Sequence, residues 1–250
     1  RPRLRSIRFK VIAAALGASA LVAIVFMPFA SEQLDRGFDQ FEIDYVTQER
    51  ARLQRVLQDR AARLGRTAID YSRWNDTVEY VAGSRPQWPD DNLTPDVFAN
   101  FNVAAIVVAD RESRVLTARG ALLEGATCAD AMRLRDFRWR FTWLPDGPHI
   151  VACSPIMLTD ATSTPVGSMT WSVRLDADRI TEMQGLVQFP FRFRPPAGEL
   201  PADQYSEGSI VASMPVLDSD GKPGLVATFD LPRPLGAQRQ LTTRTLLQLI

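Results

Sequence analysis

The segment NVAAIVVADRESRVL, Asn102–Leu116, decides the fold predicted for this 250-residue chain. Its apolar first half is typical of a buried strand, which we expect to begin at Asn102, and its second half predicts another strand near Arg114–Ala118. A polar turn containing Asp110 joins the two, so they should pair as a hairpin. We therefore expect an antiparallel sheet, since no alternation of strands and long helices follows.

The same alternation of strands and turns continues downstream. HIVACSPIML and GSMTWSVRL predict two strands, and SIVASMPVLD and GLVATFDLP predict two more around the turn SDGKPG. Asp130–Phe137 and Asp176–Val187 predict short helices, whereas the proline-rich FPFRFRPPAGELP is expected to be irregular. His149 follows the turn Pro145–Gly147, which favours an exposed or strand-edge position. This order indicates an α+β architecture with helices on one side of the sheet.

Upstream of the hairpin, Ser31–Val81 reads as one long helix or two in series. Its apolar positions recur at three- and four-residue steps, as in Phe38, Phe41, Tyr45 and Leu53. Such a stripe packs either against the chain's own domain or against a parallel helix of a second copy. We expect the second arrangement, a homodimer formed through this helix.

The chain begins with a basic head and an apolar run that predict a membrane anchor. VIAAALGASALVAIVFMPFA, Val11–Ala30, has twenty uncharged residues, enough to cross a bilayer core of about 30 Å as a helix. The head, residues 1–10, carries five basic and no acidic residues and should stay in the cytoplasm. A cleaved signal peptide is the alternative. Residues 31–240 then form an extracytoplasmic domain, and 241–250 begin a second membrane helix.

Charge and motif content exclude several function classes. Without the head, the chain has 24 basic and 29 acidic residues. This balance does not favour nucleic acid as a partner. The single histidine, His149, excludes a multi-histidine metal site and leaves little for a Ser-His-Asp triad. No nucleotide-binding, nucleophile-elbow or zinc-protease motif occurs. We therefore expect no catalytic residue, metal or cofactor in this region.

The two cysteines are a possible disulfide. Cys128 and Cys153 are too far apart in sequence for a CxxC redox or zinc motif. Outside the cytoplasm they can pair, and closing the loop between them could stabilise the fold by about 3 kcal/mol. The alternative, which the sequence supports equally well, is that both cysteines are buried free thiols.

Several segments, taken in order, resemble a known family, the fourth type of CHASE domain. They are YSRWNDTVEYV (Tyr71–Val81), Asn92, NVAAIVVADRESRVL, the stretch PDGPHIVACSPIMLTDATSTPVGSMTWSVRLDADRI (Pro145–Ile180), and the last hairpin with Leu231, Pro232 and Arg233. The resemblance covers about Leu34 to Gln240, and it depends on the order and spacing of the segments.

The resemblance implies a sensory domain with a PAS-like sheet, set between two membrane helices of a bacterial receptor. The cytoplasmic output of such receptors is often a diguanylate cyclase (GGDEF), a phosphodiesterase (EAL) or a histidine kinase. In this family two acidic residues commonly follow the tryptophan, whereas Trp74 is followed here by Asn75 and Asp76. The asparagine keeps hydrogen bonding but removes one charge.

Four residues are candidates for ligand binding. Trp74 and Asn75 should border a pocket between helix and sheet, and Asn102 should open a strand toward the helix layer. Arg174 ends an apolar strand, where its fork of donors could bind an anion or pair with Asp176 or Asp178. Trp74 as a core aromatic and Arg174 in a local ion pair remain alternatives.

Three functions from different classes follow. The favoured one is the periplasmic sensory input module of a receptor in the bacterial inner membrane, with a small-molecule ligand. The others are an ectodomain that binds a periplasmic protein and a membrane-anchored periplasmic enzyme. The enzyme is disfavoured because no nucleophile, base and orienting group are seen together.

Overall fold

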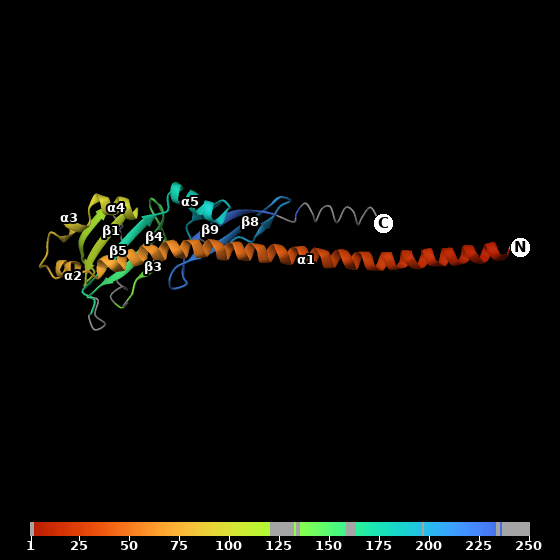
Figure 1. The fold of residues 1–250 in the computed structure, drawn as a ribbon, viewed down its shortest axis with the longest axis horizontal. Coiled ribbons are helices and arrows are strands. Elements are labelled where there is room, and N and C mark those ends of the chain that lie inside the picture. The colour runs from red at the N-terminus through yellow and green to blue at the C-terminus, as the bar shows by residue number, and fades with distance from the viewer. Residues whose placement is uncertain are drawn as a thin grey trace. The chain divides into compact units, whose positions relative to one another are not determined.

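The computed structural model describes residues 3–120, 133, 136–158, 164–196, 198–233 and 236, and excludes the side chains of residues 3–8, 20, 23, 24 and 27. Its helices are α1 (Arg3–Ser72), α2 (Asn75–Val81), α3 (Trp88–Asn92), α4 (Pro95–Phe101) and α5 (Ala177–Val187). Its strands are β1 (Ala105–Asp110), β2 (Val115–Gly120), β3 (Arg138–Leu144), β4 (Gly147–Ile156), β5 (Gly167–Arg174), β6 (Phe191–Arg194), β7 (Gln204–Tyr205), β8 (Ser209–Leu217) and β9 (Pro223–Pro232). Figure 1 shows these elements along the chain.

The chain divides into two compact units, which are described separately. One comprises Arg1–Gln48, Tyr205–Ile210 and Pro232–Ile250, and the other comprises Glu49–Gln204 and Val211–Leu231. The second unit holds the five-stranded sheet, the helices α2 to α5 and the last part of α1. It therefore contains every element that surrounds the candidate site described below.

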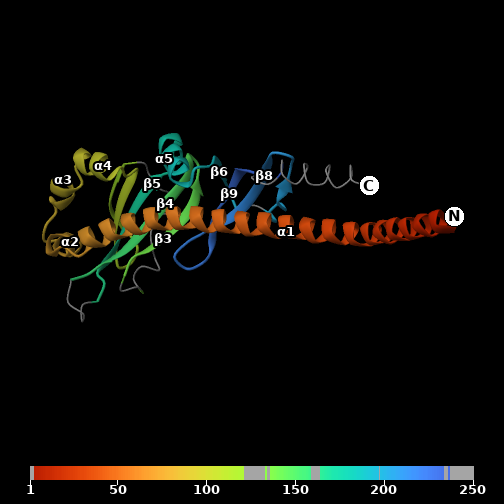
Figure 2. The ribbon, with the colours of Figure 1, turned by 45° about the vertical axis from the view of Figure 1, so that its right-hand side comes forward.

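The buried positions of α1 follow the helical period. Leu53, Leu57, Ala61, Leu64 and Ala68 are at most 8% exposed and are spaced by four or three residues, so they form one apolar stripe. Within the larger unit, this part of α1 runs along the five-stranded sheet in both ribbon views (Figures 1 and 2).

Helix α1 ends inside Ser31–Val81, the segment for which the sequence predicted either one helix or two in series. The backbone of Trp74 is extended (φ −68°, ψ 138°) and caps the N-terminus of α2. The helical region to Val81 is therefore two helices in series.

The first part of α1 exposes a row of large apolar side chains. They are 57–73% exposed and comprise Phe9, Val11, Ile12, Leu16, Leu21, Val22, Val25, Phe26 and Phe29. Such a concentration differs from the single exposed apolar residues usual on protein surfaces. Across the described part of the chain, no helix combines the length and apolar composition required of a membrane span.

The five-stranded sheet has the order β2-β1-β5-β4-β3. The predicted hairpin is present as β1 and β2, and β1 also pairs antiparallel with β5, from Ala105↔Ser172 to Asp110↔Gly167. β4 and β5 are interior strands and are buried along most of their length, as their apolar sequences predict. The sheet thus confirms the α+β prediction, with antiparallel pairing between every two neighbouring strands.

Three strands, β3, β6 and the two-residue β7, were not expected from the sequence. β3 alternates arginine with aromatic residues, so that Phe141 is buried while Arg138 and Arg140 are exposed. β6 lies inside the stretch expected to be irregular, and its alternating Phe and Arg pair with β9. Because β6, β9, β8 and β7 form a second sheet, the expectation of a single sheet is also wrong.

The turn between β8 and β9 docks on the edge strand β3. Ser219 donates from its backbone N–H and from its hydroxyl to the carbonyl of Trp139, at 3.1 and 2.9 Å. Close by, a Cβ at Gly224 would lie 1.8 Å from the carbonyl oxygen of Phe141, so only glycine fits. The expected helix at Asp130–Phe137 and the segment 241–250 fall largely or wholly outside the described residues.

Candidate functional site

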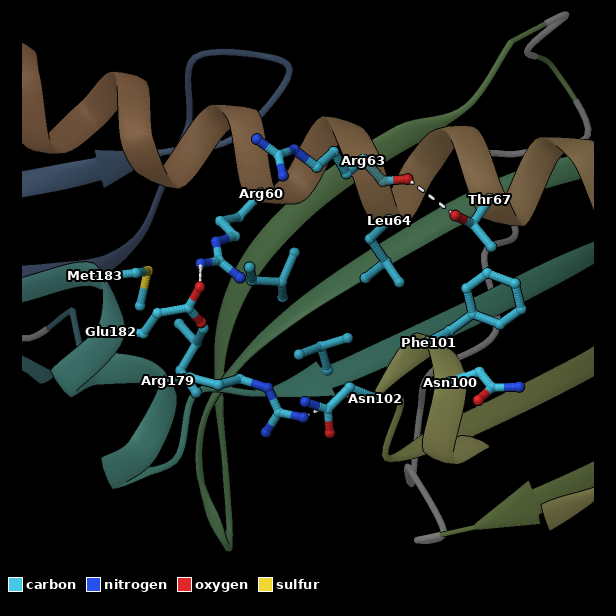
Figure 3. A pocket seen from close by; sticks show the side chains of 13 residues that line it. Arg60, Arg63, Leu64, Thr67, Asn100, Phe101, Asn102, Arg179, Glu182 and Met183 are labelled. Atoms are coloured by element: carbon cyan, nitrogen blue, oxygen red, sulfur yellow. Dashed lines mark hydrogen bonds and ion pairs between the residues drawn. The ribbon is translucent and has the colours of Figure 1, made fainter. Parts of the chain in front are cut away.

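A cavity of about 270 Å³ lies between α1, the C-terminal end of α4, strands β4 and β5, and α5. Figure 3 shows its lining. Its apolar residues are Leu64, Phe101, Ile150, Val173, Leu175 and Met183, and its polar ones are Arg60, Arg63, Thr67, Asn100, Asn102, Arg179 and Glu182. A cavity that combines apolar side chains with converging polar groups is typical of small-molecule sites.

The apolar wall comes from the periodicity of each element. Leu64 belongs to the buried stripe of α1, while Ile150 and Val173 are register partners on one face of the sheet. Met183 is buried on the inner face of α5, as its sequence position predicted. These side chains therefore reach the cavity from three elements that lie far apart in the sequence.

An ion pair bridges the two helices at the cavity. The guanidinium of Arg60 on α1 contacts the carboxylate of Glu182 on α5, and the side chains are 31% and 59% exposed. Figure 3 shows Arg60 pointing from α1 toward this carboxylate. The pair is thus partly hydrated and links α1 to α5 by a single contact.

Arg179 is held by the protein itself. Its guanidinium pairs with Asp176 and donates to the carbonyls of Arg174, at 3.0 Å, and Asn102, at 2.7 Å. Asp176 also caps α5, since its side chain accepts from the backbone N–H of Arg179. Arg179 therefore fixes the start of α5 to the end of α4.

An aromatic cluster lies next to the cavity. Tyr71 stacks on Trp74 with ring centroids 4.2 Å apart, and Tyr71 and Phe101 each meet Trp171 edge-on at 5.1 and 5.7 Å. Burial, and secondarily the charge of Asp70, raises the pKa of Tyr71. The phenol therefore stays neutral at physiological pH.

The structure separates the four predicted ligand-binding residues. Asn102 lines the cavity. It does not open a strand, because it caps α4 in the left-handed conformation (φ 55°) and β1 begins at Ala105. Trp74 is half-buried in the aromatic cluster, and Asn75 is exposed at the start of α2. Neither is part of the cavity wall.

Arg174 is also outside the cavity wall. Its side chain is 51% exposed and lies 3.8 Å from Asp146, so its acidic neighbour is neither Asp176 nor Asp178. Asp146 belongs to the turn between β3 and β4, which the register of β4 with β5 brings beside Arg174. The local sequence does not indicate this ion pair, because Asp146 and Arg174 lie far apart along the chain.

His149 is fully buried, which corrects the expectation of an exposed or strand-edge position. β4 is an interior strand, and the imidazole lies between the hydroxyl of Ser172 (Nδ1, 2.8 Å) and the carboxylate of Asp146 (Nε2, 3.0 Å). Because an ionised carboxylate can only accept, Nε2 carries the proton and Nδ1 accepts from Ser172. Burial lowers the pKa of His149, opposed by Asp146.

These three groups do not form a hydrolytic site. Ser172 is fully buried, and its hydroxyl donates to the imidazole, so no substrate carbonyl can reach it. The arrangement instead holds His149 in one orientation within the sheet. Among the described residues, no group of three or more metal-ligating side chains is found.

The cysteine prediction remains untested. Cys153 lies in β4 and is 8% exposed, next to Val151 in the buried face of the sheet. Cys128 is outside the described residues. The pairing of the two therefore stays a prediction.

Four of the cavity residues that sequence reasoning missed are charged. Arg60 and Arg63 on α1, and Arg179 and Glu182 on α5, each lie three residues apart and so share a helix face. Charges at this spacing usually mark a solvated face. Only their position opposite each other across the cavity distinguishes them, and the sequence does not show that position.

Known proteins with a similar fold are sensor domains. The periplasmic domain of LuxQ from Vibrio cholerae superposes with a TM-score of 0.53 at 12% identity, covering 74% of this chain and 99% of that domain. The sensor domain of the V. cholerae histidine kinase DctB gives 0.52 at 9%, covering 77% and 98%. At these identities the likeness shows the fold alone. It confirms the predicted long helix followed by a PAS-like α+β domain.

Sequence comparison leads to the family. The methanogenesis regulatory histidine kinase FilI of Methanothrix harundinacea (strain 6Ac) is 25% identical over 114 residues, which are 46% of this chain. The match spans only 13% of the length of that relative. The family model of the CHASE4 domain matches residues 56–194, more than half of the chain and a range that includes every residue of the cavity wall. The chain therefore belongs to the CHASE4 domain family, as its sequence indicated.

Proposed function

We propose that this chain is the extracytoplasmic sensory input module of a membrane receptor and that it binds a small molecule in the cavity between α1, α5 and the five-stranded sheet. The observation that carries the proposal is the cavity itself. It is enclosed by the α1 stripe, two interior strands and α5, and it falls within the matched CHASE4 region. Sensor domains share this fold, and a pocket that combines apolar side chains with converging polar groups is the usual form of a ligand site.

The membrane part of the proposal has separate support. Residues 1–10 form a basic cytoplasmic head, 11–30 cross the bacterial inner membrane, 31–240 lie in the periplasm, and 241–250 begin a second membrane helix. The apolar run 11–30 and the exposed large side chains along it favour a lipid environment. The excess of basic residues before the run favours a cytoplasmic N-terminus.

Dimerisation through α1 completes the module. Leu34, Phe38, Phe41 and Tyr45 are spaced by four, three and four residues, the repeat of a coiled-coil seam. Leu34 and Phe41 are 46% and 48% exposed, so these two positions of the seam are available to a second copy, whereas Phe38 and Tyr45 are half-buried. Ligand binding then shifts the two helices that lead to the membrane, and the output is a histidine kinase or a GGDEF or EAL domain. FilI, a histidine kinase, supports the kinase output.

The test is a thermal-shift screen of the 250-residue chain in lipid nanodiscs against metabolites, amino acids and metal ions. A ligand present at one hundred times its Kd stabilises the folded state by about 2.7 kcal/mol, a shift of several degrees. The ligand should lose its effect in Thr67→Trp, which fills the cavity from α1. Thr47→Trp is the matched control.

The control is close because both threonines lie on α1 and donate to the carbonyl four residues earlier, at 3.2 Å for Thr67 and 2.8 Å for Thr47. Only Thr67 lines the cavity. A shift that survives Thr67→Trp would move the ligand elsewhere. No shift with any compound, for a folded chain, would refute the small-molecule proposal and favour a periplasmic protein as the signal.

A further inference from the structure

We propose that the ligand is a small carboxylate with an apolar body, and that its carboxylate takes the place of Glu182 on Arg60. This inference rests on the proposed function, because it names the ligand class of the same cavity. It follows from the size of the cavity, the balance of its charges and the exposure of one ion pair.

The size and the wall limit the ligand to a small, largely apolar molecule. About 270 Å³ lies just below the range of about 300–1,000 Å³ usual for drug-sized ligands. Leu64, Ile150 and Met183 are at most 8% exposed and present hydrocarbon and thioether surface to the interior. The apolar part of a ligand would be buried against this surface, which favours an apolar body.

The charges at the cavity are unbalanced in favour of an anion. Three arginines line it against one glutamate, and the charge of Arg179 is already offset by Asp176. The charge of Arg60 is offset by Glu182, so Arg63 is left as the arginine of the three whose charge is not offset. No hydrogen bond or ion pair of the Arg63 guanidinium is found among the described residues, and its side chain is exposed. An uncompensated cation at the mouth of a pocket attracts anions.

The carboxylate of Glu182 indicates where the carboxylate of a ligand would bind. Its carboxylate reaches Arg60 from α5 and leaves the guanidinium with a single nitrogen–oxygen contact out of the fork of five donors. The glutamate side chain is 59% exposed, so the pair is of the weak, hydrated kind. A carboxylate held in the cavity by its apolar body can engage the same fork with two contacts and displace Glu182.

Displacing Glu182 would remove this link between the middle of α5 and α1, while Arg52 on α1 still donates to the carbonyl of Leu186 at 2.9 Å. The following turn of α5 leads into the second sheet, where the amide of Gln184 donates to the carbonyl of Phe191 at 2.8 Å. A ligand that breaks the contact between Arg60 and Glu182 therefore acts on the element that connects the two sheets. This gives the ligand a different affinity for two positions of α5, which signalling requires.

The experiment is isothermal titration calorimetry of the 250-residue chain in nanodiscs with butanoate, hexanoate and benzoate, each compared with its neutral amide. We expect binding of at least one carboxylate and no measurable binding of its amide. Arg60→Gln should weaken binding about tenfold, the size of one charge-assisted contact. Arg55→Gln, on the same helix and outside the cavity wall, should leave it unchanged.

Glu182→Gln separates competition from simple charge loss. Because the competing carboxylate is gone, binding should tighten by about threefold, whereas a supporting role for Glu182 would weaken it. Circular dichroism confirms that each variant folds. Equal binding of acid and amide, or no binding of any acid, would overturn this inference. A neutral ligand found in the broader thermal screen would then still support the proposed function.

Discussion

The ion pair between Glu42 and Arg233 offers the sharpest test of how the smaller unit is held together. Glu42 on α1 is 2% exposed, and its two carboxylate oxygens accept from Nε and Nη2 of Arg233 at 2.5 and 3.0 Å. Arg233 follows β9, donates to the carbonyl of Ser206 at 2.8 Å and lies over the ring of Tyr205. Replacing Arg233 by Met keeps the aliphatic length but removes every donor.

The cost follows from what is left behind. A buried carboxylate without its partner is destabilising by about 3–5 kcal/mol. Arg233→Met should therefore cost about 3–5 kcal/mol, because the side chain of Glu42 is only 3% exposed and cannot reach water without movement. Glu42→Gln should cost about half as much, since the side chain of Arg233 is 14% exposed and can be partly hydrated. The double change Glu42→Met with Arg233→Met should cost less than Arg233→Met alone.

Hydrogen exchange of peptides covering α1 around Glu42 and the end of β9 measures local opening at this ion pair. Urea unfolding measures the effect on the free energy of unfolding of the chain. Arg36→Met is the control, because its pair with Glu32 is exposed at 66% and 60% and should matter by less than about 0.5 kcal/mol. If Arg233→Met costs no more than Arg36→Met, or if the double change is the worst of all, the pair is not a buried charge network and the reasoning fails.

Three further predictions concern the larger unit. Because burial lowers the pKa of His149, the unfolded chain takes up a proton at this residue before the folded chain does. The free energy of unfolding should therefore fall as pH drops below about 6.5, by at most about 1.4 kcal/mol per pH unit. His149→Gln should remove this pH dependence in urea titrations at stepped pH. Gly224→Ala should destabilise by about 1–3 kcal/mol, because its Cβ would meet the carbonyl of Phe141, whereas Gly185→Ala, with open space on α5, should stabilise slightly in thermal melts. Trp171→Ala should cost about 3–5 kcal/mol in chemical unfolding, and a cost below 1 kcal/mol would contradict its place in the buried aromatic cluster.

The sequence predicts elements that carry an apolar run or an apolar period of their own. The first hairpin, α5 and the last hairpin are of this kind, because each has such a local apolar signal and a turn that ends it. β3 and β6 are not, since their outward residues are arginines beside aromatic ones, a pattern that also fits a solvated loop. Only pairing with β4 and β9 makes them strands, and pairing is not a local property.

The candidate site was less predictable than the fold for the same reason. Asn102 was identified, but for a strand position that it does not occupy. Trp74 was expected to border a pocket between helix and sheet, and Arg174 to bind an anion at the end of an apolar strand, yet their neighbours are Tyr71 and Asp146. Cavity residues come from α1, α4, the sheet and α5, so their meeting depends on tertiary packing that no single segment encodes.

The magnitude of signalling that the Arg60–Glu182 contact can support is limited. Coupling between a ligand and an output typically amounts to about 1–3 kcal/mol, whereas a hydrated ion pair is worth only about 0.2–1 kcal/mol. Breaking this contact is therefore too small to account for coupling alone. The rest must come from ordering of groups around the ligand, and Asn102 is the best placed, because its carbonyl is bonded to Arg179 at the start of α5. A ligand that moves the end of α4 would then act on α5 at two places, at its start through Arg179 and in its middle through Glu182.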